Sequence, residues 1–157
     1  MSDPVQLIVF RLGEQRYALP LAVVERIVQA VEITLLPDAP AIVLGAIDVA
    51  GRILPVLDIR QRFQLLSRGI NPTDQFLIAR TPRRTVVLAV DEALGVIETS
   101  ADEIVAAAGI VPGLDYVQGV VQLDDGLVLI HDLESFLSLD EERALDEALD
   151  QEVAHGN

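Results

Sequence analysis

The fold is decided by the stretch VLGAIDVAGRILPVL, residues 43–57. Apolar residues dominate both of its halves, and the Ala50-Gly51 pair between them is a turn signal. The stretch therefore predicts a β-hairpin with strands at 43–49 and 52–57.

Two residues near the end of this hairpin have predicted structural roles. Pro55 lacks the backbone N–H that a sheet ladder needs, so we expect it at a sheet edge or a bulge. Asp58 is expected to cap a short helix over residues 58–63.

The same pattern recurs 74 residues further along the chain, where Gly119 corresponds to Gly45 and Asp132 to Asp58. The second copy predicts another hairpin and another short helix over residues 132–136, so the sequence indicates a duplicated five-stranded unit. About ten short strands between turn signals indicate an all-β sandwich or barrel. Besides the first hairpin, the predicted strands are 5–12, 16–19, 23–28, 75–80, 85–90, 93–98, 117–123 and 127–130.

A longer helix is predicted at the end of the chain. Ser138 or Asp140 can cap it, and acidic residues suit its first turn. We expect it to fray from Gln151 to Asn157, and to dock lightly on the second repeat. Its predicted apolar stripe is Leu145, Ala148 and Leu149.

Composition excludes several classes of protein. The chain has 157 residues, a formal net charge of -14 and no cysteine. Such an acidic chain is a poor candidate for nucleic-acid binding, and it cannot form a disulfide framework. The apolar runs are far shorter than the ~20 residues of a spanning helix, and the N-terminus does not resemble a signal peptide. We therefore expect a cytoplasmic protein without direct membrane insertion.

Residues that could carry catalysis are few. His131 stands beside Asp132 and could form a catalytic pair, but a strand-end histidine near a capping aspartate is the simpler interpretation. His155 lies in the predicted fraying tail, and 124–126 is interpreted as a turn rather than a calcium loop. We predict no enzyme activity, no cofactor and no metal site.

The run GAIDVAGRILPVLDIR, residues 45–60, resembles the signature of the CheW family of bacterial chemotaxis coupling proteins. In that family Gly-x-x-Asn-x-Arg-Gly leads into an apolar-Pro-apolar-apolar-Asp run. The resemblance spans roughly residues 5–139. Other matching segments are 10–13, 17–19, 24–27, 90–91 and Gly119.

The resemblance implies a single CheW-like domain over 1–157, made of two five-stranded SH3-like β-barrels packed side by side. Their expected limits are about 15–74 and 75–139, with strand 5–12 a candidate for sharing between them. Residues 140–157 are expected to be an acidic C-terminal helix and tail.

The resemblance also implies a non-catalytic adaptor in membrane-attached receptor arrays. Its implied partners are the regulatory domain of a histidine kinase and the helical cytoplasmic tip of a chemoreceptor. The receptor tip is expected in an apolar groove between the barrels, and the kinase at the barrel ends. The candidate contact residues carried over by position are Val23, Glu25, Gly45, Val87, Ala93 and Val96.

For each apolar candidate the alternative is core packing, for Gly45 it is a backbone role, and for Glu25 it is a solvated charge. The motif residues with expected structural roles are Asp48, Ala50, Gly51, Pro55 and Asp58.

The chain departs from the family pattern at two positions, because Asp48 and Ala50 replace the expected Asn and Arg. In the family the Arg is expected to face the acidic position held here by Glu25, and Arg26, Arg52 or Arg60 could replace it. A diverged adaptor of a non-flagellar system, such as one for pili or gliding, is therefore an alternative. An alternative of another class is a β-barrel that binds small ligands or hydrolyses a substrate.

Overall fold

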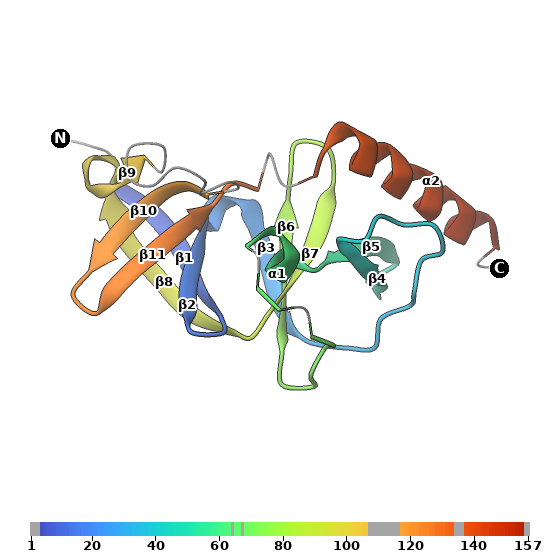
Figure 1. The fold of residues 1–157 in the computed structure, drawn as a ribbon, viewed down its shortest axis with the longest axis horizontal. Helices are drawn as coiled ribbons and strands as arrows, with labels where there is room; N and C mark the ends of the chain where they lie inside the picture. Colours follow the sequence, from blue (N-terminus) through green and yellow to red (C-terminus); the bar gives the residue numbers. More distant parts are fainter. Residues whose placement is uncertain (1–3, 64, 67, 107–116, 134–136, 156–157) are drawn as a thin grey trace.

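The computed structural model describes residues 4–63, 65–66, 68–106, 117–133 and 137–155. These residues form eleven strands in two sheets (Figure 1). The first sheet has the order β8 (Glu92–Ser100), β1 (Pro4–Leu12), β2 (Gln15–Pro20), β11 (Gly126–His131), β10 (Val117–Leu123) and β9 (Val105–Ala106). The second has the order β3 (Val24–Gln29), β6 (Gln75–Arg80), β7 (Thr85–Val90), β5 (Arg52–Leu57) and β4 (Val43–Val49). The predicted all-β fold is confirmed.

The chain itself closes each sheet into a barrel. The segment after β3 bridges to the opposite edge strand through Thr34 and Ala46. In the first sheet, the chain leaves β8, passes through the 3₁₀ turn η2 (Ala101–Glu103) and returns as β9 beside β10. Both edges of each sheet are thus connected by a short piece of backbone, which agrees with the expected pair of small barrels.

The hairpins of the two repeats are related as the sequence predicts. The β4–β5 register pairs Gly45 with Val56, after a bulge. The β10–β11 register pairs Gly119 with Ile130, also after a bulge. Each residue of the second pair lies 74 positions beyond its counterpart, so the duplication holds at the level of register.

The limits expected for the two barrels are wrong. The second sheet uses strands from residues 24–90, whereas the first combines residues 4–20 with 92–131. The reason is parallel pairing between distant hairpins, since β2 pairs with β11 and β5 pairs with β7. Strand β1 belongs wholly to the first sheet.

Successive side chains along a strand point alternately into two different hydrophobic clusters. Phe76, Ile78 and Val87 belong to a cluster of the second sheet alone, and Leu7 and Val9 to one of the first sheet. The intervening residues form a larger cluster shared by both sheets and α2. Its members from β1 and β2 are Ile8, Phe10, Leu12, Tyr17 and Leu19.

Pro55 was expected at an edge or bulge, but β5 lies between β7 and β4. The residue paired with Pro55 is Ala46, whose N–H donates to the Thr34 carbonyl at 2.8 Å and whose C=O accepts from the Thr34 N–H at 2.9 Å. The Ala46–Pro55 pair therefore exchanges no ladder hydrogen bonds. The β5–β7 ladder begins only at Val56, so the missing N–H of proline leaves no partner unsatisfied.

Two conformations near this hairpin follow from the sequence. Ala50 and Gly51 both have positive φ, 52° and 86°, as a two-residue hairpin turn requires. The Asp48 carboxylate accepts a hydrogen bond of 2.8 Å from the Gly51 N–H. Asp58 accepts one from the Arg60 N–H at 3.2 Å and caps α1 (Ile59–Arg62) as predicted.

The second short helix, predicted over 132–136, is not seen at Asp132 and Leu133, and residues 134–136 lie outside the described residues. The C-terminal helix α2 (Leu139–His155) is confirmed. The Glu141 N–H donates to the Ser138 hydroxyl at 3.1 Å, and the Ser138 N–H donates to the Glu141 carboxylate at 3.0 Å. This reciprocal pair is a capping box. The helix continues to His155, beyond the predicted onset of fraying.

Candidate functional site

A shallow hollow of about 610 Å³ lies where the chain passes from the first sheet to the second. The 3₁₀ turn η1 (Leu21–Val23) makes this passage between β2 and β3. Leu21 and Ala22 form one wall, and the start of β1 with Glu98 of β8 forms the other. The other lining residues are Pro4, Val5, Gln6 and Pro20. We call this surface the crossover hollow.

Strand β8 extends the apolar character of the hollow. Val96 pairs with Ile8, and Glu98 pairs with Gln6, so Val96 and Glu98 lie on the same face of β8. The Val96 residue is 51% exposed although it sits on a strand. Leu94, 46% exposed, lies at the bulge in the β1–β8 register. A partner seated in the crossover hollow would therefore meet an apolar strand face.

The structure brings only some of the predicted groove residues to this area. Ala93 is half-buried against the shared core on the same strand as Val96. Val23 is also half-buried, but it lines a separate hollow with Arg80 and Pro82. Leu21 was not predicted from the sequence. It lies in the turn between the two sheets, and a strand pattern does not indicate the position of such a residue.

Two other candidates have structural surroundings. Val87 has no exposed surface and packs with Phe76 and Ile78 in the second sheet, so the structure supports the core alternative there. Gly45 is buried, and a Cβ built on it would lie 2.3 Å from the carbonyl oxygen of Thr34. Glycine at this position lets the closing segment approach β4.

The structure also shows which of the candidate arginines faces Glu25. Arg52 donates from Nη1 to the Glu25 Oε2 at 3.1 Å, and Arg80 Nε lies 4.0 Å from the other carboxylate oxygen. Arg52 follows the turn at Ala50 directly. A guanidinium thus reaches Glu25 from the same hairpin in which the resemblance implies one, shifted by two residues.

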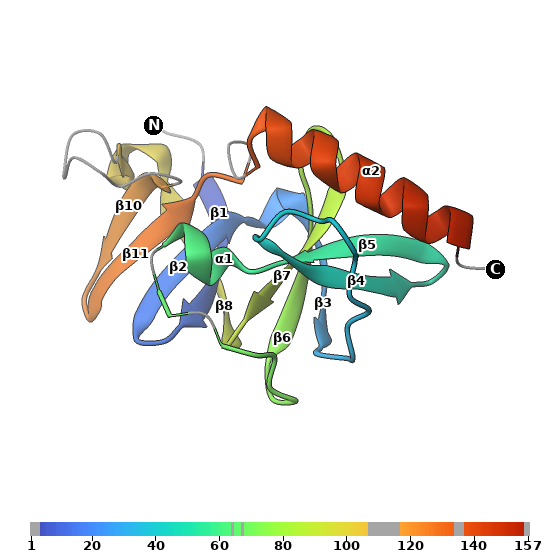
Figure 2. The ribbon, with the colours of Figure 1, turned by 45° about the vertical axis from the view of Figure 1, so that its right-hand side comes forward.

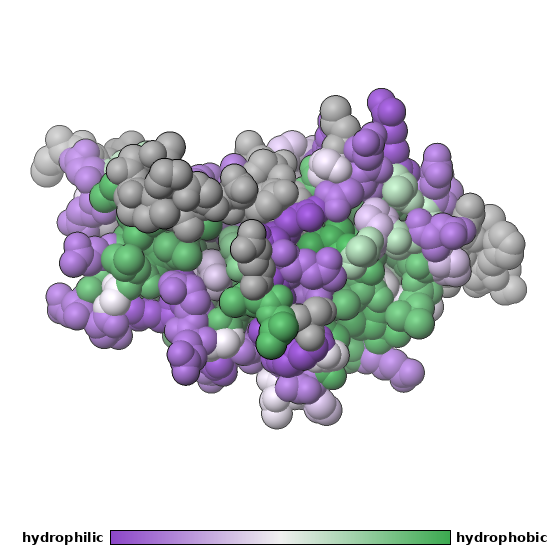
Figure 3. Space-filling model, in the orientation of Figure 1, coloured by the Kyte–Doolittle hydropathy of each residue, from purple (hydrophilic) through white to green (hydrophobic). Residues whose placement is uncertain are grey.

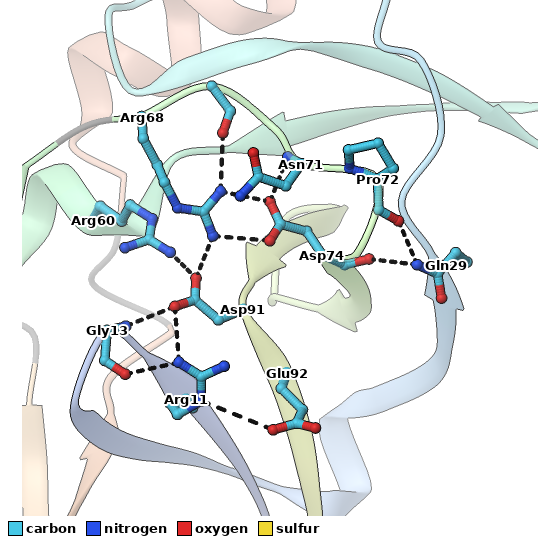
Figure 4. A network of polar contacts seen from close by, with 11 residues as sticks. Arg11, Gly13, Gln29, Arg60, Arg68, Asn71, Pro72, Asp74, Asp91 and Glu92 are labelled. Carbon is cyan, nitrogen blue, oxygen red and sulfur yellow. Dashed lines mark hydrogen bonds and ion pairs between the residues drawn. The ribbon is translucent and has the colours of Figure 1, made fainter.

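A polar network joins the two sheets at their second crossover, between β7 and β8 (Figure 4). The Asp91 carboxylate accepts from the Gly13 N–H at 2.8 Å and from Arg68 at 2.6 Å, and it also binds Arg60. Arg68 binds Asp74 through two hydrogen bonds of 2.8 and 2.9 Å. Burial alone would raise the pKa of Asp74, but hydrogen bonds from Arg68 and Asn71 lower it.

The network connects the β1–β2 turn, α1 and the segment before β6, so it fixes how the barrels meet. In the sequence, residues 90–91 were identified only as a segment that matches the CheW family, and the ion pairs of Asp91 could not be inferred from the sequence.

His131 is buried, with 1% of its surface exposed. Its ring meets Phe63 edge-on, with centroids 5.1 Å apart. Burial lowers the pKa of the imidazole to about 3, against a smaller opposing effect of Asp132. The enclosed imidazole is therefore neutral, and it packs against Phe63 in the interior.

Neither a membrane-spanning helix nor a cluster of three or more metal-ligating side chains occurs within the described ranges.

Two interlocked β-barrels with a recessed apolar surface at their crossover define the class, a double-barrel β domain. The chain belongs to the CheW-like domain family, whose model matches residues 6–141.

Similar proteins support this membership. The chain is 29% identical to the "Probable chemotaxis protein CheW" of Rhizobium etli, over 88% of this chain and 91% of that one. It is 25% identical to the "Chemotaxis protein CheW" of Treponema pallidum, over 87% and 84%. Among solved structures it resembles the scaffolding protein TtCheW of Thermoanaerobacter tengcongensis, with a TM-score of 0.80, 27% identity, and coverage of 88% and 96%.

Proposed function

We propose that this protein is a non-catalytic adaptor that couples chemoreceptors to a histidine kinase. The observation that carries the proposal is the crossover hollow, an apolar recess at the junction of a two-barrel CheW-like fold. The adaptor would act on the cytoplasmic side of receptor arrays, because the receptor tip is its partner there.

The proposed receptor contact is a helix lying against β8 and η1. Val96 and Leu94 are exposed apolar side chains on an element that otherwise packs its apolar residues inward. An amphipathic helix recognises such a surface by burying apolar side chains at intervals of three and four residues. Ala93 and Leu21 would form the floor of this contact.

The proposed kinase contact lies at the end of the second barrel, where Glu25 and Arg52 meet. Their side chains keep 24% and 49% of their surface exposed, so both remain available to a partner. A partly wet ion pair contributes register and orientation more than affinity. The kinase and receptor sites use different residues, which allows one adaptor to hold both.

The experiment is calorimetric titration with the regulatory domain of the cognate kinase and with the receptor's helical tip. We expect affinities near micromolar, about -8 kcal/mol. Val96→Asp places a charge in the receptor contact and should weaken receptor binding at least about tenfold. Kinase binding should not change.

A matched control is available on the same sheet. Leu127 is 50% exposed and stands at the β10–β11 turn, outside the lining of the crossover hollow. Leu127→Asp should leave receptor binding unchanged. Equal losses in both variants would contradict the receptor site, and no binding of either partner by the wild type would contradict the adaptor function.

A further inference from the structure

The C-terminal helix α2 lies mostly beyond the family match. The family match ends at residue 141, whereas α2 has 17 residues and continues to His155. It lies along the second barrel, over β7 and β5, and both views agree on this placement (Figures 1 and 2). The helix was expected on the barrel of residues 75–139; it does contact Arg84 of that range, but it also contacts Arg62 of the range 15–74.

Its apolar contact with the barrel is narrow. Leu145 and Ala148 are 0% and 1% exposed, and Leu149 packs partly buried beside them. These side chains join the cluster that contains Leu57 and Leu88 of the second sheet. Spacings of three and four residues put them on one face of the helix.

Charge complementarity holds the same face in place. On the β6–β7 turn, the Nε of Arg84 donates to the Glu142 carboxylate at 2.7 Å, and its guanidinium also binds Asp146. Arg62 at the end of α1 binds Glu141. The two guanidinium side chains are only 15% and 18% exposed, so they are recessed into the barrel surface rather than solvated.

The arrangement is that of a helical ligand seated in a receptor. The described outer side chains of α2 are mostly hydrophilic, while apolar surface continues below it over β4, β5 and the segment before β4 (Figure 3). Most of the stability of a helix in a protein comes from the packing of its apolar face rather than from its intrinsic propensity. The order of α2 therefore depends on the contacts just described.

We propose that the strip beneath α2 is a helix-binding site and that α2 is its resident, displaceable occupant. We define the strip by Arg62, Arg84 and three apolar residues of the shared core, which are Leu57 of β5 and Val86 and Leu88 of β7. The partner that displaces α2 is an amphipathic helix with two carboxylates four residues apart, like Glu142 and Asp146. None of these residues lines the crossover hollow, so the proposal does not depend on the receptor site.

The test uses a fluorescent peptide of residues 138–155 as the probe and the full-length protein as the receptor. The wild type should bind this peptide weakly, because α2 already occupies the strip. Leu145→Asp should release α2 in cis and increase peptide affinity at least about tenfold. Arg84→Ala in that background should reverse the gain. The matched control Arg83→Ala, an exposed neighbour on the same turn, should retain it.

Other outcomes would overturn the proposal. A folded Leu145→Asp protein that binds no peptide shows that the strip does not accept a helix in trans. Loss of the barrel fold in this variant, seen by circular dichroism, shows that α2 is an integral part of the core.

Hydrogen exchange of the wild type gives an independent measurement. Amides of α2 should exchange faster than those of β7, because local opening releases the helix alone. Exchange of both at the same rate, through global unfolding, would contradict a displaceable helix.

Discussion

His131 offers a quantitative test of the packing in the first barrel, through the substitution His131→Leu. The residue that corresponds to it in the other repeat is Leu57, which takes the same place in the β4–β5 register. Leucine therefore suits this position, and the contact surface of Phe63 can be kept. The substitution removes a titratable group from the core and leaves the carboxylates of the protein unchanged.

The magnitude follows from the difference in pKa between the folded and unfolded states. The imidazole has a pKa of about 3 when folded and of 6.5 when unfolded. Below pH 6.5 the unfolded chain binds a proton that the folded chain excludes. The free energy of unfolding therefore decreases by about 1.4 kcal/mol for each pH unit, and by about 2 kcal/mol at pH 5. The decrease should continue until the pH approaches the folded pKa.

The assay is urea unfolding of the wild type and of His131→Leu at pH 7 and pH 5. The wild type should lose about 2 kcal/mol more than the variant between these two conditions. Effects of carboxylate protonation occur in both proteins and cancel in the comparison. An equal loss in the two proteins would show that His131 is not enclosed as described.

Three further substitutions test other parts of the account. Val87→Asp should prevent the second barrel from folding, seen as lost circular dichroism, since an unpaired carboxylate in a core costs several kcal/mol; a folded variant would contradict the assignment of Val87 to the core. Gly45→Ala should lower the free energy of unfolding by about 1 to 3 kcal/mol. This loss should exceed that of Gly119→Ala, because a Cβ at Gly45 would lie 2.3 Å from a backbone oxygen, whereas a Cβ at Gly119 would lie 2.7 Å from a side-chain methyl group. Denaturant titrations in which Gly119→Ala is the more destabilising variant would refute this. Ala50→Arg should change kinase affinity by less than about tenfold, because Arg52 already holds the acidic partner; calorimetry showing a larger gain would mean that the arginine must stand at the turn itself.

Local signals predicted the strands well, because turns and alternation are properties of neighbouring residues. The Ala50-Gly51 turn, for example, determines the limits of β4 and β5. The grouping of strands into sheets was not predictable in this way. It depends on parallel pairs such as Val56 with Val87, which join hairpins from different repeats and leave no mark in either hairpin alone.

The candidate site was only partly predictable for a similar reason. Alternation assigns Val87 and Val96 to faces of their strands, but it does not say which face the rest of the fold covers. The fold buries Val87 and leaves Val96 exposed. The partner of Glu25 and the role of Arg84 likewise depend on contacts between distant segments, at a separation of 27 and 58 residues.

The most direct test of the adaptor function is whether one chain holds both partners at once. Sedimentation of the protein with the kinase regulatory domain and the receptor tip should give a ternary complex whose mass is the sum of the three components. Val96→Asp should remove the receptor tip from this complex and leave the kinase domain bound. Competition between the two partners for the same adaptor would contradict the account, because it would show that the proposed sites are not separate.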